Sequence, residues 1–255
     1  MNVRELFDLT GKTAIVTGGG SGIGRQMAEA LAELGANLVL CARKVERCEQ
    51  AADELSKLGV KAFGMGCDVR DPEQVQAVVD RTIGELGRID VLLNNSGTTW
   101  GAPAEEMPRE GWDKVIDVNL TGTFFFSQAA ARHMIERGGG VMVNTASVAG
   151  MRAGMGGIGT ASYHASKAGI IMLTRALAGE WAKHGIRVNA IAPGWFPSNM
   201  SKWVLDNMGE QMRAGIPLGR FGGEHDLKGV IAYLTTEASA YVTGQTIAVD
   251  GGQTI

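Results

Sequence analysis

A tyrosine and a lysine share one face of a predicted helix. Tyr163 and Lys167 are four residues apart, and their face continues as an apolar stripe at helical spacing as far as Trp181. A lysine at the head of a buried stripe is costly unless its ammonium group has a partner or a task. A phenol has an ordinary pKa of about 10, and a cation held beside it would favour the phenolate. The pair therefore predicts proton transfer at Tyr163, and the alternative is a surface pair whose lysine reaches solvent.

Two further polar residues belong with this pair in the predicted arrangement. Ser147 ends a predicted strand over 140–147, so its hydroxyl would lie at the sheet edge where the Tyr163 helix begins, within reach of a substrate carbonyl or hydroxyl group. Asn119 lies on the buried face of a predicted helix over 112–126, where an amide needs partners. Taken alone, Asn119 fits a structural role as well as a functional one, such as holding a water molecule.

A glycine-rich turn follows the first predicted strand, which covers 12–17. Glycines at such a turn let the backbone approach a pyrophosphate, whose charge would be held by the free N–H groups of the next helix. That helix should end at Gly35. The spacing is G-x-x-x-G-x-G, one residue longer than the usual dinucleotide-binding fingerprint, and the alternative is an ordinary turn between a strand and a helix. The predicted cofactor-binding residues of this turn are Gly18, Ser21, Gly22, Ile23 and Gly24.

The end of the second predicted strand, 37–41, bears on which nicotinamide cofactor would bind. An acid there would bind the ribose 2′-OH of NAD, whereas an arginine can accommodate the 2′-phosphate of NADP. The chain has no acid at this point and reads Cys41-Ala42-Arg43-Lys44. Arg43 therefore predicts a preference for NADP(H), with NAD(H) still usable. The alternative is a surface charge paired with Glu46 or Glu49.

These residues need a framework, and the sequence predicts one in which strands alternate with helices. Such alternation is typical of βαβ units and a parallel sheet. No linker, charge block or repeat divides the chain, so one domain is expected over 1–255. The least regular stretches, 147–161 and 194–223, follow predicted strands, and loops at the carboxyl ends of strands are where such sheets bind ligands. The seven expected strands are 12–17, 37–41, 60–64, 89–94, 140–147, 186–193 and 245–252.

Composition and charge exclude several classes of protein. The 24 basic and 27 acidic residues leave a formal net charge of −3, which does not indicate a nucleic-acid partner. The first twelve residues lack the apolar region of a secretory signal, and no run approaches the roughly 18 apolar residues of a membrane span. Cys41, Cys48 and Cys67 match no common zinc pattern and the four histidines form no ligand cluster, so we expect a cytoplasmic protein with reduced cysteines and no metal. His164 points roughly 100° away from Tyr163 around the helix, which favours a structural role.

Together these motifs resemble the short-chain dehydrogenase/reductase family over essentially the whole chain. The resemblance implies an α/β fold with a single-domain Rossmann-like doubly wound sheet of seven mainly parallel strands and helices on both faces. It also implies hydride transfer between a nicotinamide and a substrate carbonyl carbon, and family members are commonly homotetramers. The motifs follow the family's order as Thr17-Gly18-x-x-x-Gly22-x-Gly24, Asn94-Asn95-Ser96-Gly97, Asn119, Ser147, Tyr163-x-x-x-Lys167 and Pro193-Gly194.

The resemblance also implies roles for individual residues. In the catalytic tetrad, Tyr163 would deliver the proton and Ser147 would orient the carbonyl. Lys167 would lower the pKa of Tyr163 and bind the nicotinamide ribose, while Asn119 would hold a water molecule in a proton relay. The implied cofactor contacts are Asp68 and Val69 near the adenine, then Asn95, Ser96 and Gly97, and beside the nicotinamide the 194–198 segment with Pro193, Gly194, Phe196 and Ser198.

The chain departs from the family pattern at three places. Ser96 stands where the family usually has alanine, and Ser198 replaces a frequent threonine while keeping the hydroxyl that would reach the nicotinamide amide. Ser147 and Tyr163 are 16 residues apart, more than is common, because of a glycine-rich insert over 151–159. The insert is expected to change the substrate mouth and not the chemistry.

The sequence leaves the substrate class open. Segments 97–102 and 192–200 look closest to gluconate 5-dehydrogenase-like enzymes and to the β-ketoacyl reductases of rhamnolipid synthesis, so the substrate would be a keto-sugar acid or polyol, or a β-ketoacyl thioester. A non-catalytic NADP(H) sensor or scaffold is the alternative from another class, although it would have no use for the complete tetrad. A carboxylate could be held by Arg152, Lys202 and Arg213. One set of residues on the predicted mouth loops favours an apolar substrate: Trp100, Met151, Met155, Trp195, Phe196, Met200 and Trp203. The alternative is that these residues pack within a lid over 194–223.

Overall fold

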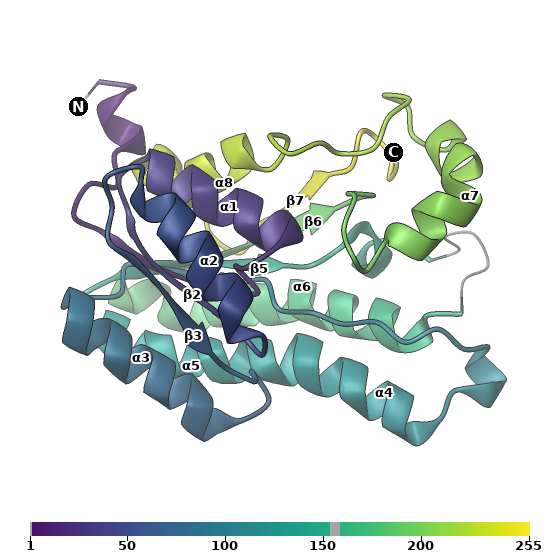
Figure 1. Cartoon of the computed structure of the whole chain (residues 1–255), viewed down its shortest axis with the longest axis horizontal. Helices are drawn as coiled ribbons and strands as arrows, with labels where there is room; N and C mark the ends of the chain where they lie inside the picture. Colours follow the sequence, from purple (N-terminus) through teal and green to yellow (C-terminus); the bar gives the residue numbers. More distant parts are fainter. Residues whose placement is uncertain (1, 154–158) are drawn as a thin grey trace.

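One sheet of seven strands forms the centre of the molecule (Figure 1). The computed structural model describes residues 2–153 and 159–255. The strand order is β3-β2-β1-β4-β5-β6-β7, and each neighbouring pair is parallel. The expected doubly wound sheet is confirmed, and it is parallel throughout. Because the strand order reverses between β1 and β4, the carboxyl ends of these two strands open the crevice where such sheets bind ligands.

The strands lie within a few residues of their predicted ranges. Each is rich in β-branched or other apolar residues, and all five residues of β1 are buried, as expected for a parallel sheet covered on both faces. The bounds are β1 Thr13–Thr17, β2 Asn37–Ala42, β3 Ala62–Gly66, β4 Val91–Asn94, β5 Gly140–Thr145, β6 Ile186–Pro193 and β7 Thr246–Val249.

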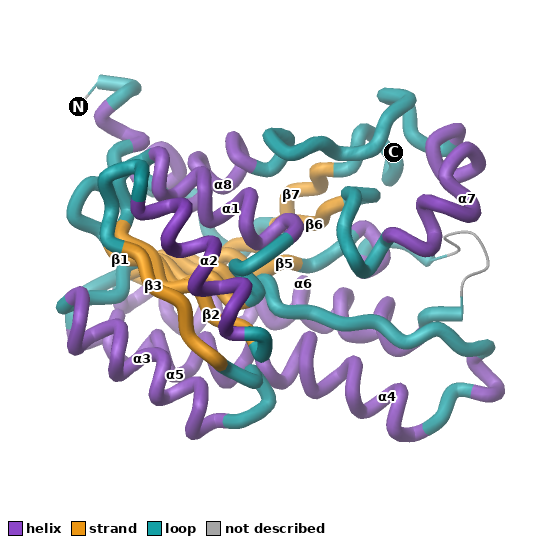
Figure 2. Tube along the Cα trace, viewed as in Figure 1, coloured by secondary structure: helices purple, strands orange, loops and turns teal. Residues whose placement is uncertain are grey.

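Helices cover both faces of the sheet (Figure 2). Along β1 to β5, apolar residues pack alternately into the two cores. Ala14 and Val16 of β1 pack into the core that includes α1, α2 and α8, whereas Ile15 packs into the core on the other face. α7 lies apart from both layers, near the C-terminus (Figure 1). The bounds are α1 Gly22–Glu33, α2 Val45–Ser56, α3 Pro72–Leu86, α4 Arg109–Ile116, α5 Gly122–Glu136, α6 Ala161–Trp181, α7 Lys202–Ala214 and α8 Lys228–Thr235.

Two helical features matter for the site. Gly35 has a φ of +90°, so the left-handed residue expected after α1 is confirmed. The helix expected over 112–126 is not uniform, because a π-helical segment, Asp117–Thr121, joins α4 to α5 and carries Asn119. Such insertions frequently occur at functional sites. Within the described residues, none of the helices has both the length and the apolar character that a membrane crossing needs.

Candidate active site

A large cavity lies along the carboxyl ends of the strands. Its volume is about 1110 Å³, and its walls come from the glycine turn after β1, the loops after β2 to β6, and the start of α7. Drug-sized molecules bind in pockets of roughly 300–1,000 Å³, so this cavity lies at the upper end of the range for ligand sites. All of the residues predicted to contact the cofactor line it: Gly18, Ser21, Gly22, Ile23, Gly24, Arg43, Asp68, Val69, Asn95, Ser96, Gly97, Tyr163, Lys167, Pro193, Gly194, Phe196 and Ser198.

The glycine turn presents bare backbone to the cavity. A Cβ on Gly24 would overlap the carbonyl of Gly18 and the amide of Asn95, so no side chain fits there. Ser21 precedes α1, and its side chain makes no capping hydrogen bond. The N–H groups of the first turn therefore keep their capacity to bind an anion. A Cβ on Gly22 would lie 3.7 Å from Ser198, which places the 194–201 segment on the opposite wall. This geometry fits a pyrophosphate.

The tip of β2 carries more positive charge into the cavity than the sequence predicted. Arg43 is exposed and lines the cavity, and within the described residues it forms no ion pair with Glu46 or Glu49. Arg47, in the first turn of α2, also lines the cavity and was missed. Its spacing of four from Arg43, directly after a predicted strand, is the signal that could have indicated it. Gly20 lets this turn come close, since a Cβ there would lie 2.9 Å from the Arg47 backbone.

The acid of the loop after β3 is paired within that loop. The Asp68 carboxylate accepts hydrogen bonds from Arg70, with Nη2 at 2.6 Å, and these bonds lower the pKa of Asp68 below its ordinary value. The Asp68 amide donates to the Gln74 side chain at 2.9 Å. Val69 packs on Gly122, where an added Cβ would lie 2.7 Å from the valine side chain. The loop is therefore fixed by its own contacts before any ligand arrives.

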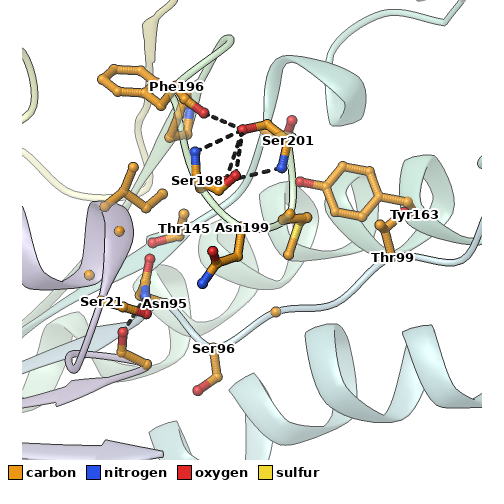
Figure 3. A pocket seen from close by; sticks show the side chains of 18 of the residues that line it. Ser21, Asn95, Ser96, Thr99, Thr145, Tyr163, Phe196, Ser198, Asn199 and Ser201 are labelled. Atoms are coloured by element: carbon orange, nitrogen blue, oxygen red, sulfur yellow. Dashed lines mark hydrogen bonds between the residues drawn. The ribbon is translucent and has the colours of Figure 1, made fainter. Parts of the chain in front are cut away.

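The loop after β4 is tied to the end of β1. The Thr17 hydroxyl accepts hydrogen bonds from the backbone N–H groups of Asn95 and Ser96, both at 2.9 Å. The Asn95 side chain donates to the Thr17 carbonyl at 3.1 Å. Asn95 and Ser96 thus lie beside the glycine turn on the cavity wall (Figure 3).

Ser147, Tyr163 and Lys167 meet where β5 ends and α6 begins. The Ser147 hydroxyl caps the short turn Val148–Gly150 by accepting from the Ala149 N–H at 3.1 Å, and it also hydrogen-bonds the Tyr163 phenol. Lys167 Nζ donates to the Thr145 carbonyl at 2.7 Å and lies 5.6 Å from the centre of the Tyr163 ring. These three side chains therefore form one wall of the cavity.

The pKa of Tyr163 moves in the direction opposite to the sequence prediction. Burial raises the pKa of Tyr163 above its ordinary value, and the hydrogen bond from Ser147 offsets part of that rise. Burial also lowers the pKa of Lys167 to about 8. The prediction failed because burial has the largest effect on the pKa of the phenol, and helix spacing cannot show that burial. Tyr163 is consequently a protonated phenol near neutral pH.

Asn119 lies behind the cavity wall and is fully buried. Its Oδ1 accepts from the Thr98 N–H at 2.8 Å, and its Nδ2 donates to the Thr98 carbonyl and to the Ser166 hydroxyl, both at 3.0 Å. Ser166 in turn donates to the Tyr163 carbonyl at 2.8 Å. The side-chain amide thus joins the loop after β4 to α6, and both of its N–H groups are used within the chain.

The predicted apolar mouth residues divide into two groups. Trp195, Met200 and Trp203 line the cavity, and the latter two are exposed. Trp100 instead packs on Gly111.

The remaining residues of the predicted apolar set do not line the cavity, are less exposed than expected, or fall outside the described residues. Met151 is 47% exposed. Phe196 reaches the cavity edge but is only 6% exposed, because its ring packs on Gly222. Met155 falls outside the described residues, together with 154 and 156–158 of the insert.

The polar side chains of the mouth have partners within the chain. Lys202 pairs with Asp206 at 2.9 Å, Arg213 lies over the Phe221 ring at 5.3 Å, and Arg152 donates to the Gln253 carbonyl. The Ser198 hydroxyl lies 3.0 Å from that of Ser201 (Figure 3). The stretch 194–223 is also more regular than predicted, since it contains α7.

Some residues that line the cavity were not predicted as site residues: Thr99, Thr145, Ala146, Thr160 and His164. Thr145 and Ala146 lie near the end of the predicted strand over 140–147, and that position is the signal the sequence offered for them. Within the described residues, no group of three or more His, Cys, Asp or Glu side chains could hold a metal ion.

Comparison with known proteins relates this geometry to a family. A family model described as enoyl-(acyl carrier protein) reductase matches residues 18–254. The chain is 40% identical over 253 residues, 98% of each chain, to 2-dehydro-3-deoxy-D-gluconate 5-dehydrogenase of Escherichia coli K12. It is 40% identical over 242 residues, 94% of this chain and 97% of the other, to 3-oxoacyl-[acyl-carrier-protein] reductase FabG of Staphylococcus aureus Mu50.

A solved structure agrees with these sequence relatives. The gluconate 5-dehydrogenase of Burkholderia cenocepacia J2315, in complex with NADP and tartrate, superposes with a TM-score of 0.94 at 36% identity over 99% of both chains. Both the sequence and the fold therefore match over nearly their whole length. The chain belongs to the short-chain dehydrogenase/reductase family, and it is an NAD(P)-dependent oxidoreductase.

Proposed function

We propose that this enzyme prefers NADP(H) and interconverts a carbonyl group and a secondary alcohol, with Tyr163 as the general acid and base. One observation carries the proposal. The wall formed by Ser147, Tyr163 and Lys167 belongs to the same cavity as the glycine turn and the basic tip of β2. A proton donor and an anion site are therefore within the span of one dinucleotide and its substrate.

The residues present fit a dinucleotide with a 2′-phosphate. The bare N–H groups at the start of α1 would hold the pyrophosphate. Arg43 and Arg47 would hold the 2′-phosphate, while Asp68 and Val69 would contact the adenine. Segment 194–198 would contact the nicotinamide, and the relative from Burkholderia cenocepacia has been solved with NADP. When bound, NADPH supplies the hydride ion that the substrate carbon receives.

The chain's own residues would manage the proton. Ser147 would donate a hydrogen bond to the substrate oxygen and so orient the carbonyl. Because its pKa is raised, the Tyr163 phenol holds its proton near neutral pH and would deliver it to that oxygen as the carbon is reduced. Lys167 is still largely protonated at pH 7, so it would stabilise the phenolate left behind. Oxidation of the alcohol reverses both transfers.

Two substrate classes remain within this proposal. The relatives named above act on a sugar acid in one case and on a 3-oxoacyl carrier-protein thioester in the other. The exposed Met200 and Trp203 at the cavity mouth would suit an acyl chain. The polar atoms deeper in the cavity would suit a hydroxylated acid. Ser147, Tyr163 and Lys167 would act in the same way on the ketone of either substrate.

We also propose that the enzyme works in the cytoplasm as a homotetramer. The outer faces of α5 and α6 expose the apolar residues Ile135 and Met172. Association of subunits through these helices would remove that surface from water.

A substrate panel under both cofactors tests the proposal. The panel would contain 5-ketogluconate, a β-ketoacyl thioester and simple ketones, each assayed by the loss of NADPH or NADH absorbance. We expect turnover that depends on the ketone, with a kcat/KM at least about tenfold higher for NADPH, which corresponds to about 1.4 kcal/mol. Tight NADPH binding without turnover of any ketone would instead support a sensor or scaffold.

A further inference from the structure

Two residues that line the cavity carry a buried ring atom without a partner among the described residues. His164 Nε2 and Trp195 Nε1 are each shielded from solvent, and neither has a hydrogen-bond partner within residues 2–153 and 159–255. Both residues line the same cavity as Tyr163. A buried polar group left without a partner costs roughly 1–3 kcal/mol, so each atom calls for an explanation.

The hydrogen-bond character of His164 Nε2 follows from its other ring nitrogen. His164 Nδ1 lies 2.9 Å from the Thr160 carbonyl oxygen and 3.3 Å from the Thr160 hydroxyl. A carbonyl oxygen can only accept, so Nδ1 carries the hydrogen. In the neutral ring Nε2 is then an acceptor. The sequence assigned His164 a structural role, which Nδ1 fulfils, but the residue also lines the cavity and its Nε2 has no such partner among the described residues.

Trp195 supplies the complementary group. An indole N–H can only donate. The Trp195 backbone is fixed, because its carbonyl accepts from the Gly222 N–H at 2.9 Å and the adjoining Gly194 N–H donates to the Val249 carbonyl at 3.0 Å. Among the described residues that line the cavity, His164 on α6 therefore offers an unused acceptor and Trp195, after β6, an unused donor.

We propose that His164 and Trp195 are specificity-determining residues, and that they select a ketone bearing hydroxyl groups, such as a polyhydroxy acid, over an acyl thioester. This inference rests on the proposed function and narrows its substrate. A hydroxyl group both donates and accepts, so hydroxyl groups can satisfy both His164 Nε2 and the Trp195 N–H. An alkyl chain in the same place would leave both polar atoms buried and unpaired. A site built to bind a hydroxyl group rejects the analogue that lacks it far more strongly than an apolar site rejects an added one.

The exposed apolar side chains and the cations at the cavity mouth are compatible with this assignment. Met200 and Trp203 are 45% and 66% exposed, so they lie where the cavity meets solvent and where any substrate could pass. The mouth cations are engaged, with Lys202 on Asp206 and Arg152 on the Gln253 carbonyl. The unpaired ring atoms are thus polar groups that a substrate can satisfy without breaking a hydrogen bond between described residues.

A matched pair of ketones separates this inference from the proposed function. 5-Ketogluconate and 5-oxohexanoate share a six-carbon carboxylate skeleton and a ketone at C5, but only the first carries hydroxyl groups. The third substrate is the acetoacetyl thioester of N-acetylcysteamine. The variants are His164→Phe and Trp195→Phe, which keep an aromatic ring but remove the polar atom. His164→Gln keeps a hydrogen-bonding group as a conservative replacement. His184→Phe and Trp112→Phe make the same chemical changes at residues that do not line the cavity.

The expected readout is a ratio of kcat/KM values. The intact enzyme should prefer 5-ketogluconate to the other two substrates, and His164→Phe and Trp195→Phe should each reduce its preference over 5-oxohexanoate by about tenfold, equal to about 1.4 kcal/mol. His164→Gln should keep most of the preference, and the two control variants all of it. NADPH affinity should change little in the His164 variants and in the two controls, and melting temperature should change little in any variant.

Three results would overturn the inference. If both variants slow the two ketones equally, the residues serve the fold and not the substrate. If the intact enzyme prefers the thioester or 5-oxohexanoate, the selected class is wrong while the proposed function stands. If it reduces none of the three with NADPH, the proposed function fails and the inference fails with it.

Discussion

The buried ammonium group of Lys167 lowers the stability of the folded protein. Its ammonium is buried and donates to the Thr145 carbonyl, and within the described part of the chain it forms no ion pair with a carboxylate. Burial accounts for the lowering of its pKa to about 8. The same position that supplies positive charge beside Tyr163 therefore reduces the stability of the cofactor-free protein.

Lys167→Met should stabilise the cofactor-free enzyme while abolishing turnover. A fall in pKa from 10.5 to about 8 corresponds to roughly 3 kcal/mol, of which the lost hydrogen bond to Thr145 offsets part, leaving a gain of about 1–2 kcal/mol at pH 7. Because the folded-state pKa is depressed, the unfolded chain binds the extra proton between about pH 8 and 10.5 and wild-type stability rises through that window. The gain should therefore be full at pH 7 and small at pH 10.

Urea unfolding at the two pH values measures this gain. Lys57→Met, at an exposed lysine, is the matched control and should change little. If Lys167→Met is less stable than the wild type at pH 7, burial of the ammonium group does not cost the free energy of folding that its pKa indicates.

Substitutions at the tip of β2 should change which nicotinamide cofactor the enzyme prefers. In Ala42→Asp with Arg43→Ala, the new carboxylate would bind the NAD ribose and repel the phosphate of NADP, each effect being on the order of 1–3 kcal/mol. The NADP/NAD ratio of kcat/KM should move toward NAD by at least about 10²-fold. Arg47→Ala alone should weaken NADPH binding and leave NADH binding unchanged. An unaltered ratio in the double variant would mean that Arg43 is only a surface charge.

At the scale of elements, the sequence predicted what local rules determine. Strand ranges followed from apolar runs, and the end of α1 followed from Gly35, because both depend on near neighbours in the chain. The π-helical turn at Asn119 was not predicted, because it depends on bonds from Asn119 to Thr98 and Ser166, which are distant in sequence. α7 was not predicted, although its residues Val204, Met208 and Met212 lie at helical spacing.

Gly24→Ala should disrupt the strand, turn and helix unit that holds the cofactor. The added methyl group would meet the Gly18 carbonyl and the Asn95 amide, so the glycine turn must move. We expect NADPH binding, measured by fluorescence titration, to weaken at least about tenfold, a loss of about 1.4 kcal/mol. Gly84→Ala in α3 is the control, since a Cβ there meets nothing within 4 Å. It should leave binding unchanged and stabilise the fold by up to about 1 kcal/mol. Wild-type NADPH affinity in Gly24→Ala would contradict the role of the turn.

At the scale of the whole molecule, the sequence predicted where the cavity lies but not which side chains line it. Loops at the carboxyl ends of the strands were expected to bind ligand, and they do surround the cavity. Which side chains face inward was harder to predict, since Trp100 packs on Gly111 and Phe196 on Gly222. The direction of the Tyr163 pKa was missed for the same reason, because burial is a property of the complete fold.

Assembly into a tetramer is the prediction for the whole molecule. Light scattering should give a mass near four times 26.9 kDa. Met172→Glu would place a charge on the exposed face of α6 and should shift the enzyme to smaller species, because burying an unpaired charge is costly. Leu58→Glu alters a residue of similar exposure after α2 and should leave the mass unchanged. A stable, active wild-type monomer at micromolar concentration would contradict the tetramer.

The most direct test of the account is the turnover of Tyr163→Phe. This change removes the phenol hydroxyl but keeps the ring and leaves Lys167 on the Thr145 carbonyl. With NADPH and the best ketone of the panel, kcat should fall by at least about 10²-fold, as expected for loss of a positioned general acid, while NADPH affinity stays nearly constant. Tyr241→Phe, at a fully exposed tyrosine, should keep full activity. If Tyr163→Phe retains more than about a tenth of the wild-type kcat, Tyr163 does not deliver the proton and the central claim is wrong.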